Sequence, residues 1–219
     1  QLFPGSVDQT SQPLPITDQM VSDFEMGAEA GGVISSPCPY EIKNNITLGP
    51  VKINCSVKIS GNPTVTFTGN VWIVGDLEIA NTAVLRADAS LGNKSVVIIA
   101  DNPANRLSSS RIEMENSSEF YGSGQTGSYL LFLSQNNSAE SGGSEQAIEI
   151  GNQAEGDIIL YAGHGEILLQ NSVFLREVTG YKVHLKNSAK VEYNMGLRSA
   201  LFSTGPSGGF EIIDWKEIE

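Results

Sequence analysis

The 219-residue chain has few of the residues, and none of the common sequence motifs, on which metal sites and nucleophilic catalysis depend. It holds two histidines, His164 and His184, and neither belongs to an HxH, HExxH or Cys/His cluster, so no zinc site is expected. No GxSxG motif, no P-loop and no GxGxxG motif after a strand is present. We therefore predict no catalytic residue, no metal and no cofactor.

Basic residues are also scarce, with 13 lysines and arginines against 25 aspartates and glutamates, which gives a formal net charge of −12. Such an acidic chain repels phosphate backbones, so nucleic acid is excluded as an expected partner. No apolar run approaches the roughly 20 residues that cross a bilayer, and no signal-peptide pattern occurs. Because the chain starts at Gln1 and not at methionine, we expect any signal or membrane anchor to lie upstream.

Helical periodicity is limited to one short segment. Residues 1–15 contain three of the nine prolines and are typical of an extended linker. Residues 16–36 are predicted to form a short capping helix and a connector, because Thr17 or Asp18 can cap the helix and two glycines follow it. Its apolar positions at helical spacing are Met20, Val21 and Phe24. We expect this helix, about residues 17–30, to lie over an open end or a flank of the domain that follows.

From residue 39 onward, apolar and polar residues alternate in short segments rich in β-branched residues, which is typical of strands. These segments include VKINCSVKI, TVTFT, VWIVGDLEI, VVIIA, YLLFL, DIILYA, EILL and YKVHL. No helical segment separates them, so a βαβ fold is excluded.

An asparagine recurs directly after six of the predicted strands. The six positions are Asn62, Asn81, Asn116, Asn152, Asn171 and Asn187. The two intervals on either side of Asn116 are about twice as long as the other three. The short intervals suit one turn of a solenoid, and each long interval suits a turn with an inserted loop, at 103–110 and 135–146. Asparagine tolerates the left-handed conformation of a sharp corner, and stacked amides can bond to one another. We therefore predict that these asparagines form a structural ladder.

The predicted fold is all-β, a right-handed parallel β-solenoid at residues 37–219 with one short N-terminal helix. The stretch from Leu197 to Glu219 breaks the repeat. We expect it to act as a capping segment, in which Phe210 and Trp215 cover the other end of the solenoid or fold back along a flank.

Cys38 and Cys55 lie 17 residues apart, each beside turn residues. We predict a disulfide between them, which stabilises by about 3 kcal/mol for a loop of this length. Two free thiols in a cytosolic protein are the alternative interpretation.

Three alternative sites are left open by the sequence. Glu113 and Glu115, with Asp101, are candidates for the acid and base of a carbohydrate-active β-helix enzyme, although their alternation also fits the solvent face of a strand. The polar loop 134–146 offers oxygen ligands for a weak Ca²⁺ site. The row Thr64-Val65-Thr66-Phe67-Thr68 suits an ice-binding or other surface-binding solenoid, but equivalent segments do not continue it.

Several segments resemble a known family. They are PCPYEI, WIVGDLEI, LGNKSVVIIAD, GSGQTGSYLLFLSQNNSAESGGSE, LYAGHGEILLQN, EVTGYKVHL and YNMGL, with LPITDQMVSDFEMGAEAGG before them. They are similar to the β-solenoid domains of type IV pilin-like (PilX-type) bacterial envelope proteins. The resemblance implies a non-catalytic module at the cell surface, with pilus or envelope components, and a glycan or protein ligand, as its partners. It implies membrane contact only through an upstream helix, and it carries no catalytic residues.

Overall fold

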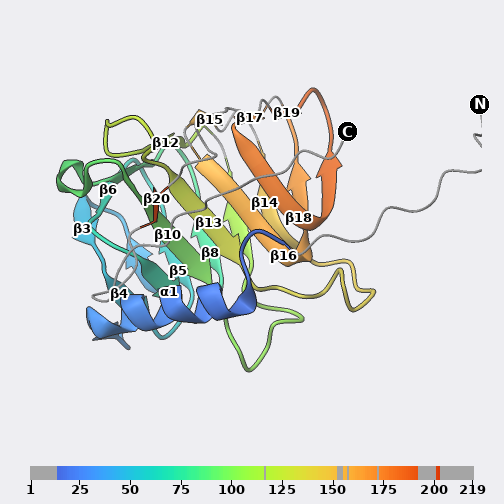
Figure 1. Ribbon diagram of the computed structural model, residues 1–219, viewed down its shortest axis with the longest axis horizontal. Helices are drawn as coiled ribbons and strands as arrows, with labels where there is room; N and C mark the ends of the chain where they lie inside the picture. Colours follow the sequence, from blue (N-terminus) through green and yellow to red (C-terminus); the bar gives the residue numbers. More distant parts are fainter. Residues whose placement is uncertain are drawn as a thin grey trace, which may run out of the picture.

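A computed structural model shows a mostly parallel β protein with one α-helix (Figure 1). The structure describes residues 14–115, 117–151, 155–156, 158–171, 173–191 and 201–202. The predicted class, all-β with parallel strands and a short helix near the start, is confirmed. The linker predicted at residues 1–15 lies almost entirely outside the described residues.

The strands form three groups, here called walls, and the chain passes through one strand of each wall in turn. The first wall contains β1 (Val33–Ile34), β4 (Val51–Ile53), β7 (Val71–Ile73), β10 (Lys94–Ala100), β13 (Leu130–Ser134) and the first halves of β16 (Ile158–Leu169) and β18 (Glu177–Leu185). The second wall contains β2 (Tyr40–Ile42), β5 (Val57–Ile59), β8 (Leu77–Ile79), β11 (Ile112–Met114), β14 (Gln146–Ile150) and the second halves of β16 and β18.

The third wall contains β3 (Ile46–Leu48), β6 (Thr64–Phe67), β9 (Val84–Ala87), β12 (Glu119–Tyr121), β15 (Glu155–Gly156), β17 (Phe174–Leu175) and β19 (Lys190–Val191). A short 3-10 helix, η1 (Ala89–Leu91), precedes β10, and β20 (Leu201–Phe202) pairs with the start of β10. The first two walls are parts of one curled sheet, because β16 and β18 run through both.

Parallel pairing places each strand beside the strand one repeat later, where a repeat is one passage through the three walls. Ile53 pairs with Ile73 and Ile59 pairs with Ile79, so the step along the chain is the same in both walls. Aliphatic side chains are therefore stacked in columns that fill the space between the walls. One column of the second wall consists of Ile59, Ile79, Met114, Ile150 and Leu169, all of them buried.

Helix α1 (Asp18–Ala30) covers the outer side of the first wall (Figure 1). Thr17 caps it, and its hydroxyl oxygen accepts a hydrogen bond from the backbone N–H of Met20. Val21 and Phe24 are buried against the outward side chains of β10, β13 and β16, which are Val97, Ile99, Leu131, Leu133, Ile159 and Tyr161. Of the two predicted places, open end or flank, the helix occupies the flank.

Candidate binding site at the loop-bearing corner

The chain passes from the first to the second wall at an edge that we call the loop-bearing corner. In two successive repeats this passage is long, at residues 101–111 and 135–145. These segments correspond to the insertions expected at 103–110 and 135–146, except that Gln146 already belongs to β14, so both insertions leave the stack at the same edge. They project beside α1, in green and yellow in Figure 1.

The two inserted loops are hydrogen-bonded to each other. The Asn136 side-chain amide donates to the Ser109 carbonyl at 2.8 Å, and the Asn137 backbone N–H donates to the Arg106 carbonyl at 3.1 Å. The Ser134 hydroxyl donates to the Ser110 carbonyl at 2.6 Å. Because Ser134 and Asn136 are fully buried, these bonds fix the relative position of the two loops.

Asp101 fixes the first loop to the wall. Its side chain is fully buried and accepts two hydrogen bonds from the Arg106 guanidinium, at 2.8 Å and 2.6 Å. Its backbone carbonyl accepts a hydrogen bond from the Trp72 indole at 3.0 Å. A bidentate arginine–carboxylate pair is strong and directional, so the loop leaves the wall in one defined direction.

Glu25 reaches the same place from α1. Burial, and then the neighbouring Asp101 carboxylate, raise the pKa of Glu25 to about 8, although Arg106 and Lys52 lower it. Glu25 is therefore mainly protonated at neutral pH. A carboxyl group and a carboxylate thus meet beneath the helix, and the arginine neutralises the charge that remains.

His164 joins three segments at the same corner. Its Nδ1 lies 2.7 Å from Oε2 of Glu140 in the second loop, and its Nε2 lies 3.2 Å from Oδ1 of Asp18 at the start of α1. Burial disfavours the protonated ring, but the hydrogen bonds and charges of Asp18 and Glu140 outweigh it, so the pKa of His164 is raised. His164 lies within β16, where the register with β18 shifts between Ala162 and Glu166.

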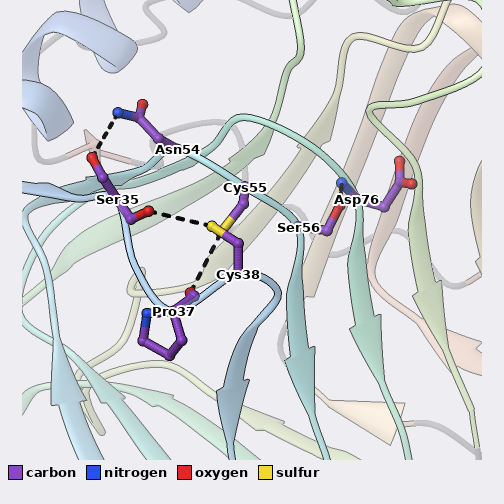
Figure 2. Close-up of a disulfide and its surroundings, with 7 residues drawn as sticks. All are labelled: Ser35, Pro37, Cys38, Asn54, Cys55, Ser56 and Asp76. Carbon is purple, nitrogen blue, oxygen red and sulfur yellow. Dashed lines mark hydrogen bonds between the residues drawn. A yellow bond between two sulfur atoms is a disulfide. The ribbon is translucent and has the colours of Figure 1, made fainter.

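The disulfide predicted between Cys38 and Cys55 is present at the same corner, in the earliest repeats, with a Cα–Cα distance of 5.9 Å (Figure 2). The alternative of two free thiols is therefore wrong. On either side of Cys55, Asn54 donates to the Ser35 hydroxyl at 3.1 Å and the Asp76 backbone N–H donates to the Ser56 hydroxyl at 3.0 Å. A disulfide indicates an oxidising compartment outside the cytosol.

Side-chain bonds continue from this region to both loops. One Asp76 carboxylate oxygen accepts from the Arg111 backbone N–H at 2.9 Å and from the Ser109 hydroxyl at 3.2 Å. The Arg111 side chain donates to the Gln146 carbonyl at 3.2 Å and lies 3.4 Å from the Glu145 carboxylate. The corner is thus cross-linked through successive repeats.

Glu113 and Glu115 do not lie with Asp101. Glu113 points outward from the second wall, in register with Glu78 and Glu149. Burial and the like charges of Glu115 and Glu149 raise its pKa, and Arg111 opposes them. Asp101 is instead held by Arg106 under α1. Among the described residues, no group of three or more His, Cys, Asp or Glu side chains could hold a metal ion.

Four of the six predicted asparagines, Asn62, Asn81, Asn171 and Asn187, lie where the second wall passes into the third. Asn81, Asn171 and Asn187 have φ values of 69°, 56° and 50°, the left-handed conformation expected at a corner. The Asn187 amide donates to the Asn171 side-chain oxygen at 3.0 Å. In the turn that contains Asn62 the left-handed residue is Gly61, with φ 81°, and the Asn62 side-chain oxygen accepts a hydrogen bond from the Thr82 hydroxyl at 2.7 Å. Asn116 and Asn152 lie outside the described residues.

The threonine row on the third wall is short. Thr47 is in register with Thr66, but the next residues of that column are Arg86 and Tyr121. Ice binding requires a regular array of threonines over many repeats. The short threonine row therefore does not support an ice-binding surface, and ice binding stays a prediction.

The fold and this corner define a disulfide-containing, mostly parallel β protein whose insertions gather at one edge. Among the described residues, no helix is both long and apolar enough to cross a membrane. Comparisons with protein-family models, with curated proteins and with solved structures find no match for this chain.

Proposed function

We propose that this protein is a non-catalytic structural or adhesion module, displayed outside the cytoplasm, and that it binds its partner through the loop-bearing corner. One observation carries the proposal: both long insertions leave the stack at one edge and are bonded to each other and to the wall. Loops held by a rigid scaffold are the usual place for binding residues. The buried polar side chains hold the loops in place, and the exposed residues 103–105, 107–108 and 140–145 are left to make contacts.

The architecture that we propose for this scaffold is a right-handed parallel β-solenoid. An equal step along the chain from β4 to β7, from β5 to β8 and from β6 to β9, parallel pairing in all three walls and an aliphatic interior support it. Such a stack gives a stiff support, because each repeat is bonded to its neighbours along the whole length of its strands.

Display outside the cell is supported by the disulfide and by the resemblance to type IV pilin-like envelope proteins. An upstream segment would anchor the module, with pilus or envelope components as neighbours. Fractionation of cells that express the full-length gene product, with protease treatment of intact cells, tests this location. A protein found only in the cytoplasm would contradict it.

The exposed parts of the loops carry amide, hydroxyl and carboxylate groups, which suit a glycan or a polar protein surface. A glycan array and a pulldown with envelope extracts test for such a partner. We expect Leu107→Ala and Ser141→Ala, both at exposed loop positions, to weaken binding. Thr66→Ala on the third wall is the matched control. If Thr66→Ala weakened binding as much as the two loop variants, the corner would be refuted as the binding site.

A carbohydrate-active enzyme is the second candidate, favoured by the raised pKa of Glu113 beside Glu115 and Glu149. Carboxylates on one wall can act as an acid and base on a sugar. Release of reducing sugar from a polysaccharide panel, lost in Glu113→Gln, would establish it. The absence of turnover across the panel would remove it.

A further inference from the structure

The two ends of the described stack are closed to different extents. In the first repeat Ile42 is buried, at 3% exposure, and the two other core positions in register with the last repeat, Tyr40 and Ile46, are half-buried. In the last repeat the corresponding core positions Val183, Leu185 and Val191 are exposed by 39%, 47% and 37%. Their partners one repeat earlier, Ile167, Leu169 and Leu175, are completely buried. The apolar interior is therefore open at the end formed by β18 and β19.

The open end has a distinctive charge. Residues 176–191 contain Arg176, Lys182, Lys186 and Lys190, and a single carboxylate, Glu177. Glu166 of the neighbouring strand β16 pairs with Lys182 at 2.6 Å and lies 3.6 Å from His184, and the strand keeps an excess of positive charge. The whole chain, in contrast, carries a net charge of −12. Within the described residues, β18 pairs only with β16, so its other edge offers backbone groups for one further strand.

We infer that residues 209–219 of the same chain bind this open end as an additional strand. This segment, GFEIIDWKEIE, lies outside the described residues and combines apolar side chains with four carboxylates and one lysine. Its alternation Ile213-Asp214-Trp215 matches that of Val183-His184-Leu185. In this register Ile213 and Trp215 cover the two exposed aliphatic side chains, and Asp214 meets His184 between two lysines.

The same observations disfavour a second copy of the chain at this place. Two such ends brought together would place the excess of lysine over carboxylate in one copy against the same excess in the other, which is unfavourable between paired strands. A segment of the same chain brings the opposite charge and has a high effective concentration.

Tryptophan fluorescence of the full chain tests the inference. The protein has two tryptophans, so Trp215 is the only one left in Trp72→Phe. We expect its emission to be shifted to short wavelength and protected from acrylamide. Leu185→Asp and, separately, Asp214→Lys in this background should shift the emission to longer wavelength and remove the protection. Leu107→Asp, which places the same change at an exposed leucine of the first loop, should do neither.

Circular dichroism establishes that each variant is folded, and sedimentation establishes its state of association. Exposed Trp215 in the folded Trp72→Phe protein would overturn the inference, as would protection that Leu185→Asp and Asp214→Lys leave unchanged. A dimer that dissociates in Leu185→Asp would show that a second copy occupies the end instead. These outcomes do not depend on whether the loop-bearing corner binds a partner.

Discussion

The Nδ1 atom of His164 lies 2.7 Å from Oε2 of Glu140, so the second inserted loop is held directly to the long strand β16. The other ring nitrogen faces Asp18, which begins α1. A neutral imidazole donates only one hydrogen bond, so both carboxylates are satisfied only when the ring is protonated. Protonation of one side chain therefore helps to hold the helix, the strand and the loop together.

The first prediction concerns this histidine. Because its folded-state pKa is raised, its contribution to stability is complete below the unfolded value near 6.5 and is lost as the pH rises through the folded value. We expect NMR titration to give a pKa above 6.5 that falls in Asp18→Asn and Glu140→Gln. The gain in stability should be below about 1 kcal/mol, since the carboxylates are exposed. An unshifted pKa in the wild-type protein would contradict this.

The second prediction concerns Glu25. An acid with a raised folded-state pKa costs stability as the pH rises from its ordinary value to about 8. Glu25→Gln should therefore be more stable than the wild type at pH 8, by about 1 to 2 kcal/mol after allowance for solvent screening. The difference should disappear near pH 4.5. Urea denaturation across this range measures it, and a difference independent of pH would rule out the buried carboxyl pair.

The third prediction concerns Arg106. Arg106→Ala leaves the Asp101 carboxylate buried without its cation, and we expect a loss of about 2 to 3 kcal/mol of unfolding free energy. This lies below the value for a fully buried pair because the Arg106 side chain is 40% exposed. Arg111→Ala is the control: its exposed pair with Glu145 should cost about 1 kcal/mol or less. Similar losses in both variants, measured by chemical denaturation, would argue against a special role for Asp101.

The fourth prediction concerns the disulfide. Cys38→Ser with Cys55→Ser should lower the unfolding free energy by about 3 kcal/mol, because the unfolded chain regains the freedom of the closed loop. The native protein should show no reactive thiol until it is reduced. Thiol titration and denaturation with and without reductant check both points, and two thiols that react in the native protein would be inconsistent with the bond.

The fifth prediction concerns the left-handed corner residues. Asn171→Ala should cost about 1 to 2 kcal/mol, because alanine does not readily adopt the φ of 56° found there. Asn171→Gly keeps the conformation available and should cost less, although it loses the bond from Asn187. Equal effects of the two substitutions on thermal unfolding would mean that the side-chain bond alone matters.

Local signals predicted much of the fold. The alternation of apolar and polar residues is present in VKI and LEI, and these segments form β5 and β8 with their apolar side chains inward. The helix expected at about 17–30 begins at Asp18 and ends at Ala30, because a capping hydroxyl and a glycine are local features. The disulfide was predicted for the same reason, from two cysteines beside turns.

Contacts between distant residues were not predicted. The flank that α1 covers is indicated by the uninterrupted apolar runs of β10 and β13, which have no polar side because both faces are buried. The meeting of Glu25 with Asp101, and of Asp18 with His164, depends on how the helix lies across the wall, and no local pattern specifies it.

The asparagine repeat shows a similar limit. The prediction followed residue type and chose Asn62, whereas the structural step that pairs Ile59 with Ile79 brings Gly61 into line with Asn81. Glycine and asparagine meet the same backbone requirement, so residue identity alone does not give the register.

The direction of α1 has a mechanical consequence. Ile16, just before the helix, accepts a hydrogen bond from Tyr161 in β16, whereas Gly32, just after it, accepts one from Lys52 in β4. At about 1.5 Å per residue, the 13 residues of the helix reach past about four repeats. A tether attached ahead of Ile16 would therefore leave the molecule at the level of β16. The earliest repeats, with their disulfide, would then lie farthest from the tether. A pulling force would act first on the bonds that join Ile16 and Asp18 to β16, and it would load the helix lengthwise along the wall.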